Sequence, residues 1–212
     1  MNQEYIKWIG IGIAGFVALL IMIIVIVVLA KKSKKRRLAE QARKNSEFVQ
    51  VLTDFGKYNE AIYLPKQTLK FEEGQIHDIA PLLLSKNGIF VLYHLVSDAK
   101  IEGNCLEREW VKKEGNKKKI FPSPIMKIDE NIKLFSKYLP AGIPIYSLLV
   151  IVGDNKEALD IYNVPGYLVV TPLNELMSNL MAIKEQAPVK LTRQNLIELN
   201  EMFRNMSVQA KK

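Results

Sequence analysis

Residues 88–103 read GIFVLYHLVSDAKIEG, and the fold can be built outward from this stretch. The first nine residues form an almost continuous apolar and aromatic run, which is typical of a strand buried on both faces of a sheet. The polar residues that follow predict a loop, and KIEG predicts a second, shorter strand. We therefore expect a sheet in which residues 88–96 form an interior strand.

Neighbouring segments predict the rest of this sheet. Short runs rich in β-branched, aromatic and leucine residues are separated by turn signals such as Glu-Glu-Gly and Lys-Asn-Gly. Asn87-Gly88 predicts a hairpin closed by a type I′ turn, because both residues tolerate the positive φ that this turn needs. Crossovers within a mixed sheet would join the later strands, which are apolar enough for interior positions. The further predicted strands are residues 60–71, 76–85, 143–153 and 166–171.

Helices are predicted before and after these strands. Residues 123–139 begin with Ser-Pro, a favoured helix entry. The segment KKEGNKKK, residues 112–119, has five lysines and no apolar residue, so we expect a solvated loop there. The order of elements predicts an α/β domain over residues 46–212. The other predicted helices are residues 38–55, 172–185 and 191–206, the last with Thr192 as its N-cap.

The longest apolar run lies near the N-terminus. From Trp8 to Ala30 there are 23 consecutive residues without a charge. As a helix this run would be about 34 Å long and would cross a hydrocarbon core of about 30 Å. A cleaved signal peptide would have a basic start and a shorter apolar core of about 7–15 residues. The pattern predicts a transmembrane helix at residues 8–30, with residues 1–7 as a short extracytoplasmic segment.

Charges beside this run predict its orientation. Six cations follow it directly, whereas the seven residues before it carry one lysine and one glutamate. Positive charge is concentrated on the cytoplasmic side of membrane spans, so we expect a single-pass cell-membrane protein with its N-terminus outside and its globular domain in the cytoplasm. Residues 31–45 would form a basic stalk that attracts anionic lipid headgroups. The headgroup-binding cations would be Lys31, Lys32, Lys34, Lys35, Arg36 and Arg37.

Charge and composition narrow the possible functions. The net charge is +8, of which residues 1–37 carry +6, so residues 38–212 are nearly neutral at +2. Cys105 is the only cysteine and there are two histidines, which excludes an intrachain disulfide and argues against a structural zinc site. No P-loop, dinucleotide-binding, zinc-protease or nucleophile-elbow motif is present. We expect no cofactor.

Residues 78–95 read DIAPLLLSKNGIFVLYHL, followed by KIEG at 100–103 and by Trp110. This arrangement resembles the nuclease-related domain, NERD, of the restriction-endonuclease-like superfamily. The family pattern is approximately EIDHIVVS, then GIFVIETKN, a glycine-bearing stretch and a tryptophan. The resemblance extends over roughly residues 45–175. It implies a restriction-endonuclease-like mixed-sheet domain behind the membrane helix.

The resemblance also implies a site whose residues have changed. Such a fold holds one or two divalent metals with carboxylates, beside a lysine that positions the attacking water. An alanine, a tyrosine and a leucine cannot perform these roles, so the resemblance implies a site without catalytic residues or metal. Carried over position by position, the family's Glu, Asp, Glu and Lys fall on Glu47, Ala80, Tyr93 and Leu95, a further Glu falls on Asp78, and a Gln falls on Lys127.

These observations lead to three functional hypotheses. The first is a membrane-anchored, catalytically inactive nuclease-like domain that acts as a binding or scaffold module. Its partners would be anionic lipid and another protein, with nucleic acid as an alternative partner through the lysine-rich segments. The second is an active, metal-dependent, membrane-tethered endonuclease with a migrated site that includes Glu47 and Asp78. The third is an anchor whose domain only fills space.

Overall fold

The computed structural model describes residues 3–71, 74–153 and 159–208, with side chains from Met22 onward. The chain divides into two units, residues 1–43 and residues 44–212. Helix α1 (Gln3–Asn59) provides the described part of the first unit and, through residues 44–59, the first helix of the second. The second unit is a mixed α/β domain, as the sequence predicts.

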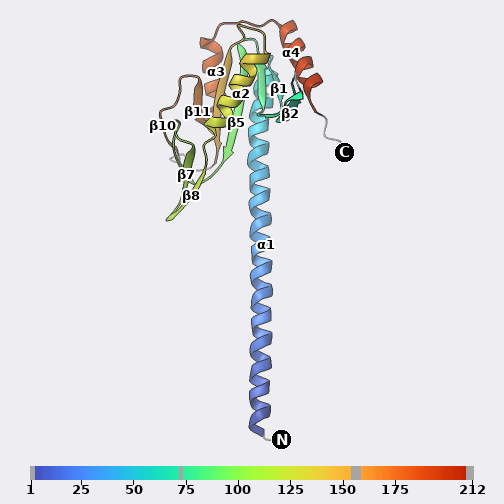
Figure 1. Ribbon diagram of the computed structural model, residues 1–212, viewed down its shortest axis with the longest axis vertical. Helices are drawn as coiled ribbons and strands as arrows, with labels where there is room; N and C mark the ends of the chain where they lie inside the picture. Colours follow the sequence, from blue (N-terminus) through green and yellow to red (C-terminus); the bar gives the residue numbers. More distant parts are fainter. Residues whose placement is uncertain (1–2, 72–73, 154–158, 209–212) are drawn as a thin grey trace. The chain divides into compact units, whose positions relative to one another are not determined.

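Figure 1 shows the helices and strands of the second unit. Its strands are β1 (Ile62–Leu64), β2 (Gln67–Lys70), β3 (Ile76–Ile79), β4 (Leu82–Ser85), β5 (Gly88–Val96), β6 (Lys100–Asn104), β7 (Glu109–Glu114), β8 (Lys117–Pro122), β9 (Ile145–Val152), β10 (Leu159–Tyr162) and β11 (Leu168–Pro172). Its helices after α1 are α2 (Ile125–Tyr138), the 3₁₀ turn η2 (Leu173–Glu175), α3 (Leu176–Gln186) and α4 (Arg193–Met206).

The main sheet is built around β5. Its five strands have the order β1-β4-β5-β9-β11, and β5 is antiparallel to β4 and parallel to β9. A second sheet of four strands has the order β10-β6-β7-β8, and β2 and β3 form a separate antiparallel pair. The sequence prediction of a mixed sheet with an interior strand at residues 88–96 is confirmed.

Alternating side chains of β5 enter two different hydrophobic clusters. Ile89 and Val91 belong to a cluster that includes residues of α2 and α4. Phe90 and Leu92 belong to a cluster with residues of α3 and the C-terminal part of α1. Successive side chains of a strand point to opposite faces, so helices cover both faces of the main sheet at β5. This two-sided burial is the reason for the nearly continuous apolar run in the sequence.

Most predicted elements are present. The helices expected at 123–139 and 191–206 are α2 and α4, and Thr192 caps α4 in a capping box with Asn195. The helix expected at 38–55 lies within α1. Two predicted strands are each divided in two: residues 60–71 form β1 and β2, and residues 76–85 form β3 and β4. Pro65 and Pro81 lie between the halves, which agrees with the absence of an N–H donor in proline.

Two predictions are wrong. Residues 112–119 form most of an antiparallel hairpin between β7 and β8 and are not an irregular loop. The β4–β5 hairpin is present, but Asn87 is not among the described residues with positive φ, so its turn is not type I′. Gly88 has φ of 144°, and a Cβ there would lie 2.4 Å from the carbonyl oxygen of Pro144. The close approach of the chain before β9 therefore requires this glycine.

The predicted membrane span falls only partly within the described side chains. Residues 8–21 of that span lie outside them. Across the described part of the chain, no helix combines the length and the apolar content needed to cross a membrane. The side chains from Met22 to Leu29 are described, and all eight are exposed by 46–61%.

Gly103 provides a test of packing in the second sheet. A Cβ at this position would lie 2.3 Å from the indole ring of Trp110, which is fully buried. Gly103→Ala should therefore lower the free energy of unfolding by about 1–3 kcal/mol through overpacking. Urea denaturation followed by circular dichroism measures this change. Gly166→Ala is the control, because no atom lies within 4 Å of the added Cβ; equal losses in the two variants would contradict the prediction.

Candidate functional site

Strand β4 pairs with only the first part of β5. Strand β4 pairs with Gly88 to Val91 of β5, and the carbonyl of Pro81 accepts a hydrogen bond from the Leu92 N–H at 2.9 Å. From Tyr93 to Val96, β5 still pairs with β9, and its side chains change from buried to half-buried or exposed. On its β4 side, β5 therefore pairs with no strand in the described part of the chain from Tyr93 onward.

A cavity of about 240 Å³ lies at this point, and we call it the β5 cavity. Its walls come from β3 and the segment after it, from β5, and from the first turns of α2. Among the described residues, its ionisable groups are one carboxylate, two lysine amines, one imidazole and one phenol. The lining residues are Lys66, Asp78, Ala80, Pro81, Leu92, Tyr93, His94, Lys127 and Asn131.

Tyr93 connects β5 to α2 at the cavity. Its hydroxyl donates to the backbone carbonyl of Lys127 at 2.7 Å. The side-chain amide of Asn131 donates to the Tyr93 hydroxyl and, at 3.0 Å, to the same carbonyl. Burial, and secondly the negative charge of Glu130, raise the pKa of Tyr93 above its usual value. Tyr93 is therefore a neutral phenol at physiological pH and not an anionic ligand.

Asp78 is the carboxylate of the cavity, and local donors already bind it. The Thr68 hydroxyl donates to Asp78 Oδ1 at 2.8 Å, and Lys66 Nζ lies 3.7 Å from Oδ2. The Thr68 hydrogen bond, followed by the positive charges of Lys66 and Lys127, lowers the pKa of Asp78. The group is ionised at neutral pH, and the two lysines exceed its single negative charge.

His94 connects β5 to α1. Its ring stacks on Phe48 with the ring centroids 4.5 Å apart, and Nε2 lies 3.1 Å from the Asn45 amide oxygen. Burial, and secondly the charge of Lys66, lower the pKa of His94. The imidazole is therefore neutral at pH 7, and its Nε2–H can donate to Asn45.

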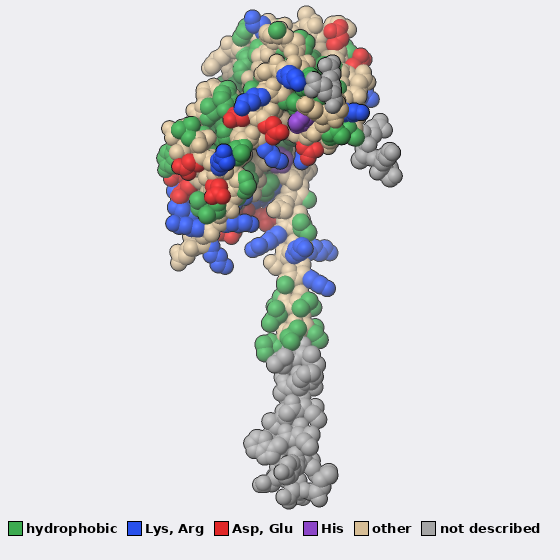
Figure 2. All heavy atoms as spheres, in the orientation of Figure 1, with side chains coloured by type: hydrophobic (Ala, Val, Ile, Leu, Met, Phe, Trp, Pro, Cys, Tyr) green, Lys and Arg blue, Asp and Glu red, His purple; other side chains and the backbone are tan. Residues whose placement is uncertain are grey.

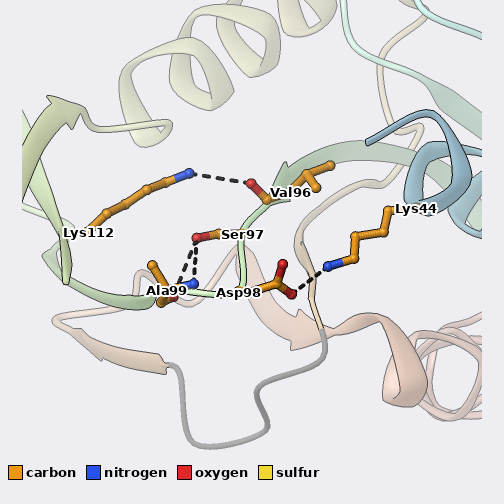
Figure 3. A network of polar contacts seen from close by, with 6 residues as sticks. All are labelled: Lys44, Val96, Ser97, Asp98, Ala99 and Lys112. Atoms are coloured by element: carbon orange, nitrogen blue, oxygen red, sulfur yellow. Dashed lines mark hydrogen bonds and ion pairs between the residues drawn. The ribbon is translucent and has the colours of Figure 1, made fainter. Parts of the chain in front are cut away.

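The segment after β5 is held from two sides, as Figure 3 shows. Lys44 of α1 is only 2% exposed, and its Nζ lies 2.5 Å from Asp98 Oδ1. Lys112 of β7 donates to the carbonyl of Val96 at 3.4 Å. Between these contacts the Ser97 hydroxyl accepts a hydrogen bond from the Ala99 N–H at 3.3 Å. Hydrogen bonds therefore connect the C-terminal end of β5 and the residues after it to α1 and to the second sheet.

The family model of the nuclease-related domain, NERD, matches residues 31–152. The chain belongs to the NERD family. Comparisons with curated proteins and with solved structures gave no match. The NERD match runs from the basic segment after the predicted span to the end of β9, so it includes every element that lines the β5 cavity, whereas α3 and α4 follow it.

The β5 cavity brings together some of the positions carried over from the NERD pattern. Ala80, Tyr93 and Asp78 line it, together with Lys127 at the position of the family's Gln. Leu95 is half-buried against the cluster around Trp110 and lies outside the lining. Glu47 is exposed on α1 and also lies outside the lining. Only some of the positions carried over from the family pattern therefore lie together at the cavity. Glu47, the position that retains the family's acidic residue, is not among them.

The donor set of the β5 cavity does not fit a divalent metal. Mg²⁺ binds oxygen ligands, commonly one or more carboxylates, and is repelled by ammonium groups. Of the lining residues that the structure describes, Asp78 is the one carboxylate, and it is accompanied by Lys66 and Lys127. Among the described residues, no group of three or more His, Cys, Asp or Glu side chains could hold a metal ion.

Among the cavity residues that sequence reasoning missed are Lys66 and Asn131. Lys66 lies in the short connection between β1 and β2, where a lysine is ordinary and gives no signal. Asn131 lies four residues after Lys127 on α2 and is buried. An asparagine four residues after a lysine on a helix suggests a polar contact only weakly. Its partner on β5 can be identified only from the fold.

The contact between Lys44 and Asp98 makes a testable contribution to stability. Lys44→Met keeps most of the apolar stem but removes the charge-assisted hydrogen bond, so the free energy of unfolding should fall by about 1–3 kcal/mol. The loss should be near the lower end because Asp98 is 50% exposed. Chemical denaturation of the full chain measures it. Lys57→Met, at an exposed position of the same helix, is the control; a stability of Lys44→Met equal to that of the control would contradict the prediction.

Proposed function

We propose that this NERD protein is a membrane-anchored, catalytically inactive relative of nucleases whose domain acts as a binding or scaffold module on the cytoplasmic face. The observation that carries the proposal is the composition of the β5 cavity. Ala80 and Tyr93, onto which the resemblance carries the family's Asp and Glu, line the cavity, and two lysines accompany the remaining carboxylate.

The chemistry of hydrolysis supports this inactivity. Metal-dependent cleavage of a phosphodiester needs a cation that stabilises both the attacking and the leaving oxygen. Asp78 is poorly placed to act as a metal ligand, because Thr68 and Lys66 already bind its carboxylate oxygens. The phenol of Tyr93 is occupied by the Lys127 carbonyl and by Asn131. The described lining of the cavity lacks the negative charge that would attract the metal.

An active endonuclease with a migrated site is the alternative. It would need further acids beside Asp78, and Glu47 does not line the β5 cavity with it. As the partner of the binding module we favour another protein, with nucleic acid as the alternative partner, because the domain keeps a folded surface while residues 38–212 carry a net charge of only +2.

Nuclease activity is the direct test of this proposal. The full chain in detergent should release no fragments from labelled single- or double-stranded DNA or RNA with Mg²⁺ or Mn²⁺. Cleavage that disappears in Glu47→Ala and in Asp78→Ala would instead establish the migrated site. The double variant Ala80→Asp with Tyr93→Glu is the positive control for metal binding. It restores two carboxylates to the cavity, so it should bind Mn²⁺ more tightly than the wild-type chain in a titration followed by electron paramagnetic resonance.

The membrane anchor rests on the apolar run and on its exposed side chains. The 23 chargeless residues from Trp8 to Ala30 have the length of a span. The side chains from Met22 to Leu29 are all exposed, an arrangement that water disfavours and lipid accepts. The basic cluster Lys31–Arg37 follows directly and favours a cytoplasmic location for the domain. Its cations would bind anionic headgroups.

Thiol labelling tests the anchor and its orientation. Gln3→Cys and Ser33→Cys are made separately in a Cys105→Ser background, so that each chain carries one reactive cysteine. A membrane-impermeant maleimide should label the first variant in intact cells and the second only after lysis. Both chains should stay in the pellet after alkaline carbonate extraction. Release by carbonate would contradict the anchor, and labelling of Ser33→Cys in intact cells would contradict the orientation.

A further inference from the structure

The β7–β8 hairpin carries a concentrated positive charge. Residues 109–122 contain five lysines and two glutamates, a net charge of +3, so the remainder of residues 38–212 has a net charge of −1. Figure 2 shows lysine and arginine side chains gathered over the end of the domain where β7 and β8 lie in Figure 1. The lysines are Lys112, Lys113, Lys117, Lys118 and Lys119.

The pairing of the hairpin places four of these lysines opposite one another, whereas Lys117 lies opposite Glu114. Lys112 lies opposite Lys119, and Lys113 lies opposite Lys118. Like charges directly opposite in an antiparallel pair are destabilising. Burial, and secondly the positive charge of Lys119, lower the pKa of Lys112. The hairpin therefore gathers charge at a cost to its own stability, and an anionic partner would relieve that repulsion.

Strand β8 has the geometry of a free binding surface. It is the edge strand of its sheet, and five of its six residues are exposed. Glu102 binds Lys113, but Lys117, Lys118 and Lys119 form no ion pair within the described part of the chain. Ile120, the next residue of the strand, is 62% exposed. Side chains alternate along a strand, so Lys118 shares a face with Ile120, and Lys117 and Lys119 lie on the other face. The exposed edge strand therefore presents cations on both faces and an apolar side chain on one.

The combination of lysines with Ile120 favours a lipid surface. Cations bind the headgroups of anionic phospholipids, while an apolar side chain can enter the boundary between headgroups and acyl chains. Binding of single-stranded nucleic acid would instead require exposed aromatic rings on which bases stack. In the hairpin, Trp110 is fully buried, and the half-buried ring of Phe121 is covered by Lys112 Nζ at 5.3 Å from its centroid.

We infer that the β7–β8 hairpin binds anionic phospholipid headgroups through Lys117, Lys118 and Lys119, with Ile120 at the headgroup boundary. The inference rests on the proposed membrane anchor, because a tether keeps the domain at a high effective concentration near the lipid, where a few weak contacts suffice. The basic cluster Lys31–Arg37 and the hairpin would then hold the chain to the same leaflet at two separated points.

The experiment measures contact between the hairpin and lipid in the full chain. Asn116→Cys, in the exposed turn of the hairpin, is labelled with an environment-sensitive fluorophore in a Cys105→Ser background. The labelled chain is reconstituted in nanodiscs of phosphatidylcholine alone or with about 30% phosphatidylglycerol, a composition that provides a negative surface potential. Emission should rise about twofold in the anionic discs and should fall again at high salt, because screening weakens attraction between exposed charges.

A matched pair of triple variants identifies the residues responsible. Replacing Lys117, Lys118 and Lys119 by glutamine should abolish the response to anionic lipid. Replacing Lys70, Lys133 and Lys190 by glutamine removes the same charge from exposed positions elsewhere and should leave the response in place. Circular dichroism checks that both variants are folded.

Each other outcome has a separate meaning. Failure of the chain to enter either type of disc would refute the anchor. Entry with equal emission in both discs would overturn the hairpin inference alone, as would an equal loss of response in the two triple variants. An emission change produced by duplex DNA in phosphatidylcholine discs, without a response to anionic lipid, would show that the hairpin binds nucleic acid and would also overturn the inference.

Discussion

The burial of β5 on both faces is the constraint on which the domain depends. Ile89 and Val91 pack toward α2 and α4, while Phe90 and Leu92 pack toward α1 and α3. A strand with apolar side chains on both faces is stable only between two layers. Strand β5 also joins the antiparallel part of the sheet to its parallel part, through β4 and β9. The helices and the sheet order are therefore organised around a single strand.

The candidate site lies where that burial ends. At Tyr93 the strand is beyond its pairing with β4, and its side chains line a cavity beside the first turns of α2. An enzyme of the NERD pattern would place carboxylates at this transition between core and solvent. Here a phenol hydrogen-bonds to the backbone of α2 and to Asn131. These contacts tie β5 to α2 and use the polar positions for cohesion of the domain.

Positive charge is distributed unevenly along the chain. The cluster after the apolar run and the β7–β8 hairpin hold most of the excess, and the remainder of the domain is close to neutral. Lys44 differs from both groups, because its buried amine pairs with Asp98 and holds the end of β5. The same residue type therefore serves two roles. Burial and a carboxylate partner make Lys44 structural, whereas Lys117 to Lys119 are exposed, have no ion pair with any residue that the structure describes, and are available for an anion.

Local patterns in the sequence were sufficient for much of the fold. The apolar run of β5, the Ser-Pro entry to α2 and the Thr192 cap of α4 are signals contained within a few residues, and each predicted its element. The NERD pattern likewise predicted the family, and it indicated that Tyr93 and Ala80 lie at site positions. The 23-residue chargeless run predicts a membrane span by its composition alone.

Local sequence patterns are thus enough to identify the family and the strands and helices with strong periodicity. The hairpin at KKEGNKKK follows from long-range pairing alone, because β7 gains its backbone partners from β6 and β8, whereas the lysine side chains gain no burial that a pattern could reveal. The tertiary structure also decided the charge of the β5 cavity, because Lys66, Asp78 and Asn131 come from separate elements. Such a meeting depends on packing between distant segments, and no local periodicity encodes it.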